Sequence, residues 1–492
     1  MLLDRAIAKI AAAGIGVSGI VGSAEGVGVS SVTSDSRAVQ PGALFCCIPG
    51  AVTDGHRFAS DAVRAGAVAL LCERELPVPV PQVVVPPGNA RRAMAQVAAE
   101  VYGRPAERLA VAGVTGTNGK TSVTLLVRSM MEAAGIPTRS MGTLDGPRTT
   151  PEAPVIQERL ARWADEGARA AVLEVSSHAM TQHRVDGIVF ACVAFTNLSH
   201  DHLDYHGDME AYFEAKASLF TPARARSAVV AVDDRWGLAL ADRLDASGEL
   251  PVTRVRMDDA TEVRVDLGAT IYRWRDLEVR LRTTGAFGVR NALVASAVAM
   301  TLGATPEAVV AGLAAAPPVP GRMEVVPGGD RQVLVDFAHT PAALEVVLET
   351  ARQLAGGGRV WCVFGCGGDR DRAKRRPMGA VVARLADVAV VTSDNPRTED
   401  PDAIIAEVVA GTAEATVGPG GRRAHVVVQP DRAAAITMAV AEARPGDVVV
   451  VAGKGHETSQ VVGDRRIEFD DRQVARAALA AVSRQGVGGE AR

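Results

Sequence analysis

Short apolar runs alternate with stretches whose apolar residues recur at helical spacing along most of the chain. Near the N-terminus the apolar runs predict strands at 27–32, 43–48, 67–72 and 82–85, and helical spacing predicts helices at 57–65 and 90–102. Strands that alternate with helices are typical of α/β folds. Residues 1–106 are therefore expected to form a small α/β domain that ends near Arg104 and Pro105.

The same alternation continues in two further segments. Between residues 107 and 318 we expect buried strands at 109–114, 170–175, 189–196 and 227–232, with a long helix at 122–134. From residue 319 to 492 we expect strands at 332–337, 359–365, 388–393 and 447–452. Strands this apolar are covered on both faces, which indicates mostly parallel sheets, Rossmann-like in the last domain. The Pro- and Gly-rich stretch at 315–321 predicts a hinge between these two domains.

Composition supports an α/β protein of three domains and narrows the function. A chain of 492 residues suggests about three domains at roughly 150 residues each. The formal net charge of −4 provides no basic field for nucleic acid, and six cysteines without a CxxC pair argue against a disulfide scaffold or a zinc site. The uncharged stretch at 10–24 is rich in glycine and predicts a short helix running into a loop rather than a signal peptide. We expect a cytoplasmic monomer with no membrane insertion.

A glycine-rich turn between the strand at 109–114 and the helix at 122–134 is typical of a phosphate-binding loop. Its sequence is Gly113-Val-Thr-Gly-Thr-Asn-Gly-Lys120-Thr121. Glycines let backbone N–H groups close around phosphate oxygens, and the N-terminus of the following helix adds positive potential. Lys120 would reach the β- and γ-phosphates, and the Thr121 hydroxyl would hold Mg²⁺. The strict pattern has its first glycine one position later, so this is a variant loop.

Further polar segments follow strands of the same domain. Glu174 lies at the end of the strand at 170–175, where a carboxylate could bind Mg²⁺ or simply precede a capped helix. Residues 200–206 hold three histidines and two aspartates, which favours a metal or phosphate site over a solvated loop. The spacing does not say which histidine is used. Lys216 follows in a helical stretch, where spacing alone suggests a surface residue.

In the last domain four polar or glycine-rich loops, at 335–341, 364–371, 393–397 and 452–457, each follow a predicted strand. Ligands of open α/β sheets lie beyond the carboxyl ends of the strands, so these loops should converge on one rim. Arginine binds a carboxylate with its planar fork, whereas Asp and Glu bind ammonium groups. The loops together predict a site for a ligand that carries both charges.

Lysine is rare in this chain. Of 53 basic residues only five are lysine, namely Lys9, Lys120, Lys216, Lys374 and Lys454. Arginine serves elsewhere as the general cation, so a retained lysine can offer a titratable amine or a compact charge that a guanidinium cannot. Four of the five lie in or near the polar segments described above, which makes chance a weaker explanation.

These segments together resemble the Mur ligases of peptidoglycan synthesis, over residues 30–475. The resemblance rests on Gly-Thr-Asn-Gly-Lys-Thr at 116–121, Glu-Val-Ser-Ser-His at 174–178, Asp-His-Leu-Asp-Tyr-His-Gly at 201–207 and Asp-Asn-Pro-Arg at 394–397. Ser-Asp-Ser-Arg at 34–37 is similar to the branch that adds the third residue of the stem peptide. The resemblance implies an ATP- and Mg²⁺-dependent ligase. It would join meso-2,6-diaminopimelate to UDP-N-acetylmuramoyl-L-alanyl-D-glutamate through an acyl phosphate.

The resemblance also assigns roles to domains and residues. The first domain would bind the UDP-linked substrate, the second ATP in a P-loop-type site, and the third the amino acid. The ATP residues would be Gly113, Thr115, Gly116, Thr117, Asn118, Gly119, Lys120, Thr121, Asn291, Arg322, Asp336 and His339. The residues for the UDP-muramoyl dipeptide would be Ser34, Ser36, Ala51, Val52, Thr53, Thr149, Thr150, Ser176, Gln182 and Arg184. The diaminopimelate residues would be Arg370, Asp394, Asn395, Pro396, Arg397, Gly453 and Glu457.

Catalytic and metal-binding roles follow from the same resemblance. The catalytic residues would be Lys120, Glu174, His202 and Lys216, and the Mg²⁺ ligands Thr121, Glu174, His202 and Lys216 as its carbamate. The carbamate would turn the amine into a carboxylate, which arginine cannot imitate, so Lys216 is not expected at the surface. Arg397 could hold the distal carboxylate of diaminopimelate, a group that L-lysine lacks.

Three alternatives are weighed against this interpretation. A folylpolyglutamate synthetase shares the ATP loop and the acyl-phosphate chemistry, but it lacks an N-terminal domain with the 34–37 and 54–58 segments. The related ligase MurF is disfavoured by the loop at 394–397. A nucleotide-binding protein without catalysis would be expected to lose Lys120, Glu174 or Lys216, and all three are present. Ser199-His200 replaces a Thr-Arg pair common among relatives, so the role of His200 is open.

Overall fold

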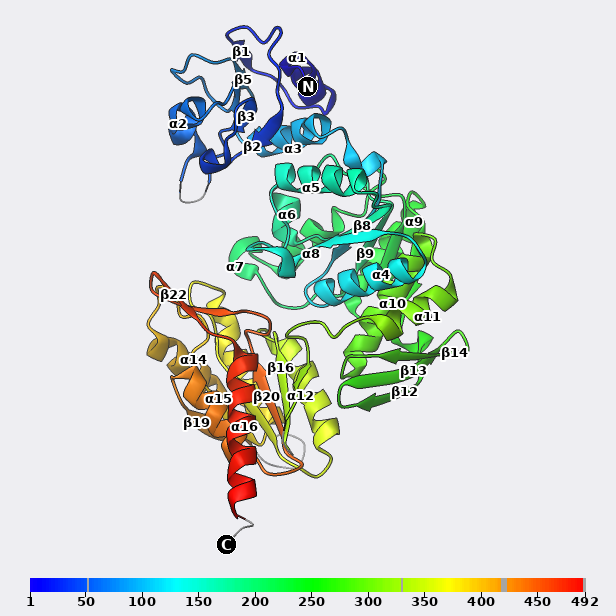
Figure 1. Ribbon diagram of the computed structural model, residues 1–492, viewed down its shortest axis with the longest axis vertical. Helices are drawn as coiled ribbons and strands as arrows, with labels where there is room; N and C mark the ends of the chain where they lie inside the picture. The colour runs from blue at the N-terminus through cyan, green and yellow to red at the C-terminus, as the bar shows by residue number, and fades with distance from the viewer. Residues whose placement is uncertain (51–52, 329–330, 417–422, 490–492) are drawn as a thin grey trace.

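A computed structural model describes residues 1–50, 53–328, 331–416 and 423–489 (Figure 1). Three α/β units follow one another along the long axis, with the N-terminal unit at the top of the view and the C-terminal unit at the bottom. The predicted fold class, a three-domain α/β protein, is confirmed. Ala51 and Val52, which the sequence assigned to the UDP-linked substrate, lie outside the described residues.

The N-terminal unit is built on a five-stranded sheet in the order β1-β5-β4-β3-β2. Only β1 runs antiparallel to its neighbour. The strands are β1 (Gly19–Val21), β2 (Ser31–Thr33), β3 (Ala43–Cys46), β4 (Ala69–Cys72) and β5 (Gln82–Val84), and the helices are α1 (Leu3–Ala12), α2 (Ala59–Arg64) and α3 (Ala90–Val101). The helix expected from the 10–24 stretch begins earlier, and the glycines after it form a loop and the short edge strand β1, which was not predicted.

The central unit has a six-stranded, fully parallel sheet in the order β11-β10-β9-β6-β8-β7. Its strands are β6 (Ala110–Thr115), β7 (Thr138–Met141), β8 (Ala170–Glu174), β9 (Cys192–Phe195), β10 (Ala228–Ala231) and β11 (Val252–Val255). The helices are α4 (Lys120–Ala133), α5 (Ala153–Asp165), α6 (Ser177–Thr181), α7 (Leu203–His206), α8 (Met209–Ala217), α9 (Arg235–Ser247), α10 (Ala286–Thr301) and α11 (Pro306–Ala315). Separate apolar cores cover the two faces, which is why the strands read as continuous apolar runs.

A three-stranded antiparallel sheet, which was not predicted, is inserted before α10. It consists of β12 (Thr261–Asp266), β13 (Ala269–Trp274) and β14 (Leu277–Leu281). Alternate residues of these strands are exposed, so the segment carries many charged side chains and lacks an apolar run. Tyr272, Trp274 and Val279 on its inner face join the core beside α10.

The C-terminal unit has a six-stranded sheet in the order β15-β16-β20-β17-β18-β19, in which only the edge strand β15 is antiparallel. Its strands are β15 (Glu324–Val326), β16 (Gln332–Asp336), β17 (Val360–Phe364), β18 (Val388–Val391), β19 (His425–Val428) and β20 (Val448–Ala452), followed by the hairpin β21 (Ser459–Val462) and β22 (Arg465–Glu468). The helices are α12 (Pro341–Ala355), α13 (Arg375–Leu385), α14 (Pro401–Ala413), α15 (Arg432–Glu442) and α16 (Asp471–Gly489).

Strand order explains why residues far apart in the sequence meet. In the central sheet β6 lies between β8 and β9, so the loops after these three strands leave the same edge side by side. In the C-terminal sheet β16, β20, β17 and β18 are consecutive neighbours, and their four following loops form one rim, as the sequence predicted. Both rims are carboxyl ends of parallel strands, where α/β proteins bind ligands.

Two simple expectations can be compared directly with the structure. Within the described residues, no helix is long and apolar enough to cross a membrane. All six cysteines are buried and free, which agrees with the expectation that they do not form a disulfide scaffold.

Candidate active site

A cavity of about 640 Å³ lies between the rims of the central and C-terminal sheets. The central unit contributes the loop at 117–122, Glu174 and the loop after β9, and the C-terminal unit contributes all four of its strand-end loops. The predicted residues that line the cavity are Thr117, Asn118, Gly119, Lys120, Thr121, Thr149, Glu174, His202, Asn291, Arg322, Asp336, His339, Arg370, Asp394, Asn395, Arg397, Gly453 and Glu457. One cavity is therefore lined by residues that were expected to bind ATP, the metal ion and the amino-acid substrate.

The loop between β6 and α4 has the backbone that a phosphate-binding loop needs. Gly116 and Gly119 have φ angles of +145° and +87°, which only glycine adopts readily. A Cβ on Gly116 would lie 1.9 Å from the Thr196 hydroxyl oxygen, and one on Gly119 would lie 2.4 Å from Asn291 Oδ1. Lys120 Nζ donates to the carbonyl oxygens of Gly116 and Thr117, both at 2.8 Å. The loop therefore holds its lysine on the cavity side before any anion arrives.

Lys216 lies deep under the same loop. Its side chain is 1% exposed, and Nζ donates to the Gly116 carbonyl at 2.9 Å and lies 4.6 Å from the centre of the Tyr212 ring. Burial, with Lys120 nearby, lowers the pKa of this amine well below its ordinary value. The structure therefore contradicts the surface position that spacing alone suggested, and the burial of the amine favours its neutral form.

Glu174, at the end of β8, is fixed from the neighbouring loop. Its carboxylate accepts the Thr143 N–H at 2.9 Å and the Thr143 hydroxyl at 3.0 Å. Gly142 must be glycine here, because a Cβ would lie 2.0 Å from Glu174 Oε1. These two donors do not use all the lone pairs of the carboxylate, so Glu174 can still bind a cation in the cavity.

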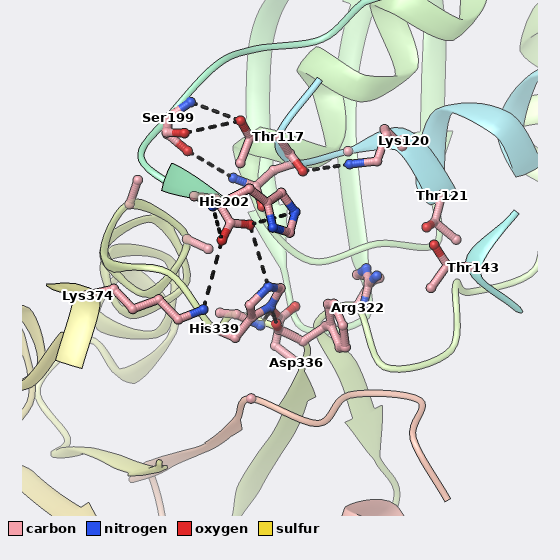
Figure 2. Close-up of a pocket in the computed structure, with 18 of the residues that line it drawn as sticks. Thr117, Lys120, Thr121, Thr143, Ser199, His202, Arg322, Asp336, His339 and Lys374 are labelled. Carbon is pink, nitrogen blue, oxygen red and sulfur yellow. Dashed lines mark hydrogen bonds and ion pairs between the residues drawn. The ribbon is translucent and has the colours of Figure 1, made fainter. Parts of the chain in front are cut away.

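Asp201 forms an electrostatic link between the central and C-terminal units. Figure 2 shows Lys374 and His339 of the C-terminal unit on the side of the cavity that faces His202 of the central unit. The Asp201 carboxylate lies 3.9 Å from Lys374 Nζ, 3.8 Å from His339 Nε2 and 3.5 Å from His202 Nε2. Burial would raise the pKa of Asp201, but the surrounding basic groups outweigh burial and lower it. His202 has a left-handed backbone, φ +57°, and burial lowers its pKa. Asp201 therefore stays ionised opposite a cation of the other unit.

The strand end at β16 holds a compact group of polar side chains. Asp336 accepts the backbone N–H groups of Met323 and Ala338, both at 2.7 Å, and burial raises its pKa. The Arg322 guanidinium lies over the Phe337 ring at 4.4 Å. His339 Nδ1 donates to the Phe337 carbonyl, so the neutral ring presents a bare Nε2. Burial lowers the pKa of His339 to about 4, which favours this neutral form.

The residues predicted to bind the amino-acid substrate converge at the loops after β18 and β20. Asn395 Nδ2 donates to Glu457 Oε2 at 2.9 Å, and buried Lys454 Nζ donates to both Glu457 Oε2 and Asn395 Oδ1. Asp394 Oδ1 is buried with no hydrogen-bond partner, and burial raises the pKa of its carboxyl group. Arg397 Nη1 donates to the Gly368 carbonyl at 2.6 Å. Anionic and cationic groups thus line one wall of the cavity, whereas Pro396 does not line it.

The predicted muramoyl-dipeptide residues gather beside the cavity on the central unit. The Thr150 hydroxyl donates to the Glu174 carbonyl at 2.8 Å and accepts the Ser176 N–H at 3.1 Å. Arg184 donates to the Thr150 carbonyl and to Gln182 Oε1. The predicted uridine diphosphate residues Ser34, Ser36 and Thr53 belong to the N-terminal unit and do not line the cavity.

Sequence reasoning missed several residues that shape this site. Thr143 fixes Glu174, and Lys374 faces Asp201 from the other unit. His200, whose role the sequence left open, pairs with Asp371 at 3.0 Å between Nε2 and Oδ2. The rarity of lysine had singled out Lys374, and that signal could have assigned it to the site. The other contacts join residues too far apart in the sequence to be inferred from spacing.

The donor set was also compared with what a metal ion needs. Among the described residues, no three His, Cys, Asp or Glu side chains are grouped so that they could hold a metal ion. Thr121 and Glu174 line the cavity next to the phosphate-binding loop. They supply only part of an oxygen shell, which fits Mg²⁺, because this ion is commonly bound by one or two protein groups together with nucleotide phosphates.

Comparison with known proteins matches this geometry. The chain matches three family models: the Mur ligase family catalytic domain at residues 28–112, the Mur ligase middle domain at 114–299 and the Mur ligase glutamate ligase domain at 321–455. Similar proteins named UDP-N-acetylmuramoyl-L-alanyl-D-glutamate--2,6-diaminopimelate ligase occur in Synechococcus elongatus and Syntrophomonas wolfei. They are 44% and 42% identical to it, over 92% and 91% of this chain and 94% of each relative.

A solved structure of a ligase with the same name is 32% identical and superposes with a TM-score of 0.62. The superposition covers 92% of this chain and 95% of the solved one. The family models match the three successive units described above, and the relatives extend over nearly the whole chain. This protein belongs to the Mur ligase family.

Proposed function

We propose that this ligase joins meso-2,6-diaminopimelate to the D-glutamate of UDP-N-acetylmuramoyl-L-alanyl-D-glutamate, with ATP as the energy source. The observation that carries the proposal is the cavity between two facing rims. One rim has a phosphate-binding loop, and the other has paired groups for an amino acid. The relatives' names specify the same two substrates. Such substrates suit a cytoplasmic enzyme.

The reaction would proceed in two balanced steps. The D-glutamate carboxylate attacks the γ-phosphorus of ATP, which forms an acyl phosphate and releases ADP. The neutral amine of diaminopimelate then attacks the acyl carbon; the C–O bond to phosphate breaks, and inorganic phosphate leaves with the proton that the amine loses as the amide bond forms. The first step brings anions together, so positive charge must lie where negative charge develops. Lys120 supplies that charge from the loop, and Arg322 supplies it from the opposite rim.

Mg²⁺ would supply further charge neutralisation at the phosphates when bound. Thr121, Glu174, His202 and Lys216 as its carbamate are the residues that would hold it. A neutral amine is the form that reacts with CO₂, and the lowered pKa of Lys216 favours that form. The Thr143 hydrogen bonds keep the Glu174 carboxylate in place beside the loop.

The UDP-linked dipeptide and the amino acid would bind to different units. The dipeptide would bind Thr149, Thr150, Ser176, Gln182 and Arg184, with its uridine diphosphate on the N-terminal unit. The amino acid would bind the loops after β17, β18 and β20. There Arg397 would hold the distal carboxylate, while Asp394 and Glu457 would hold ammonium groups. Facing rims also exclude water, which protects an acyl phosphate from hydrolysis.

Phosphate release is the test. The enzyme would be given ATP, Mg²⁺ and UDP-N-acetylmuramoyl-L-alanyl-D-glutamate, with meso-diaminopimelate, LL-diaminopimelate or L-lysine added in turn. We expect release only with a diaminopimelate and faster release with the meso isomer. Release with lysine alone would overturn the role given to Arg397, and no release with any of the three would overturn the proposed reaction.

A variant pair sharpens the assignment of Arg397. R397A should lose about 10⁴-fold in the preference for diaminopimelate over lysine, since a site built for a polar group discriminates strongly against analogues that lack it. R376A is the matched control, because Arg376 is an exposed arginine that pairs with Glu414 and does not line the cavity. An equal preference in R397A and R376A would exclude Arg397 from substrate recognition.

A further inference from the structure

Three arginines from separate segments converge on one carboxylate at the junction of the N-terminal and central units. Glu152 Oε2 accepts Arg91 Nη1 at 3.0 Å, and Oε1 accepts Arg148 Nη1 at 2.6 Å. Arg184 Nη2 lies 3.3 Å from the same Oε1. Arg91 belongs to α3 of the N-terminal unit, whereas the other three residues belong to the central unit.

This cluster is not electrically balanced. Three guanidinium groups share one carboxylate, so two positive charges are in excess among the four side chains. Glu152 immediately precedes α5, so its backbone is fixed at the start of a helix of the central unit. Side-chain exposure is 15% for Glu152 and 10% for Arg184, so solvent screens their interaction only partly.

The neighbouring residues fix the Arg184 guanidinium but do not use all of its hydrogen-bond donors. Its two Nη atoms donate to the Thr150 carbonyl and to Gln182 Oε1. Its Nε is buried and has no hydrogen-bond partner. A buried donor without a partner is costly, so an acceptor brought by a ligand would be bound here. Glu152 Oε1 lies 3.3 Å from Nη2 of the same guanidinium and so restrains one end of it.

Arg91 links the Glu152 carboxylate to the N-terminal unit. It lies at the start of α3, and α3 packs directly against α5. The same Glu152 carboxylate therefore orients Arg184 with one oxygen and binds the N-terminal unit with the other. Within the described residues, Glu152 is the one carboxylate that pairs with both Arg91 and Arg184.

We propose that Glu152 is a positioning residue that couples the binding of the substrate's D-glutamate end at Arg184 to the placement of the N-terminal unit through Arg91. The inference rests on the proposed function, in which one long substrate is bound at its uridine end by one unit and at its peptide end by another. Binding both ends gains affinity only while the two sites keep the right separation. Glu152 and Arg91 fix that separation.

The test compares two ligands by calorimetry. UDP-N-acetylmuramoyl-L-alanyl-D-glutamate reaches Arg184, whereas UDP-N-acetylmuramoyl-L-alanine lacks the terminal residue. In E152Q and R91A we expect roughly three- to tenfold weaker binding of the first ligand, and unchanged binding of the second within about twofold. The KM for the first ligand should rise with kcat kept within about twofold, because the reacting groups are untouched.

Several variants separate positioning from simple structural support. R91A/E152Q should bind no more weakly than E152Q alone if Arg91 acts through Glu152. R91K should recover part of the loss. R108A is the matched control, because Arg108 also connects to α5 through Asp165 but at its other end. It should bind both ligands as the wild type does.

The opposite outcomes are equally clear. Equal weakening of both ligands, additive losses in the double variant, or the same loss in R108A would overturn the coupling. E152Q is isosteric, and its melting temperature together with that of R91K identifies any failure to fold. If the wild type binds neither ligand, the proposed function fails. If the wild type binds both and the variants match it, only this inference fails.

Discussion

Lys216 is a buried residue whose proposed role cannot be inferred from its spacing in the sequence. Among the described residues its amine donates to the Gly116 carbonyl oxygen and lies against the Tyr212 ring, and burial lowers its pKa. We predict that K216R loses at least about 100-fold in activity, since a guanidinium stays charged and cannot become an oxygen ligand. Phosphate release measures the loss. Carbon-13 NMR after incubation with labelled bicarbonate should show a carbamate signal that K216R lacks.

The matched control for this prediction is K9R. Lys9 is 44% exposed and pairs with Glu100 in the N-terminal unit, far from the loop after β6. K9R should retain wild-type activity. If K216R kept activity within about tenfold of K9R, the carbamate role of Lys216 would be wrong.

His456 allows a prediction about acid stability. Its ring lies 5.3 Å from the Phe337 ring, and burial lowers its pKa to about 4. In the unfolded chain the pKa is about 6.5, so below that pH the unfolded state binds more protons. The contribution of the neutral His456 ring to the free energy of unfolding is therefore fully present above pH 6.5, and it is lost as the pH falls towards 4. The melting temperature of H456Q should fall less between pH 7 and 5 than that of the wild type, and an equal fall would contradict the assignment.

At the scale of elements, the repeated strand–loop–helix pattern could be predicted because buried parallel strands are apolar throughout. The loops after β16, β17, β18 and β20 followed from it, and so did their common rim. The sheet of β12, β13 and β14 could not be predicted, since its exposed face removes the apolar signal. Contacts such as Asp201 with Lys374 also escaped, because they depend on how two separate sheets face each other.

The start of α4 offers a test of close packing at an element boundary. Gly119 combines φ +87° with a Cβ position 2.4 Å from Asn291 Oδ1, so G119A must both strain the backbone and displace Asn291. Backbone strain of this kind costs about 1–3 kcal/mol. We expect G119A to weaken ATP binding at least about tenfold, measured by calorimetry, because the loop N–H groups move as well.

Gly103 provides the comparison for G119A. It has φ +73° but open space around its Cβ position, so G103A carries backbone strain alone. G103A should lower the melting temperature and leave ATP affinity unchanged. If both variants bound ATP as the wild type does, the close approach of Gly119 to Asn291 would have no role in nucleotide binding.

At the scale of the whole molecule, the proposed function depends on two sheets that present their carboxyl ends to one cavity. The phosphate-binding loop belongs to one unit and the loops proposed for the amino acid belong to the other, so the proposed reaction requires the arrangement in which they face each other. Asp201 with Lys374, and His200 with Asp371, are polar contacts between the two units that depend on that arrangement. The hinge expected near 315–321 connects these two units, so opening there would break both contacts.

His200 gives a direct test of this dependence. Its side chain is 43% exposed, so its pairing with Asp371 is worth about 0.2–1 kcal/mol, or up to about fivefold in an open–closed equilibrium. H200A should therefore raise the KM for both ATP and the amino acid by a few-fold, although His200 itself does not line the cavity. H200R supplies N–H donors that can reach Asp371 and should behave as the wild type. Small-angle scattering should show H200A, and not H200R, to be more extended with substrates bound. A change in only one KM would mean that His200 acts on a single substrate rather than on the facing of the two units.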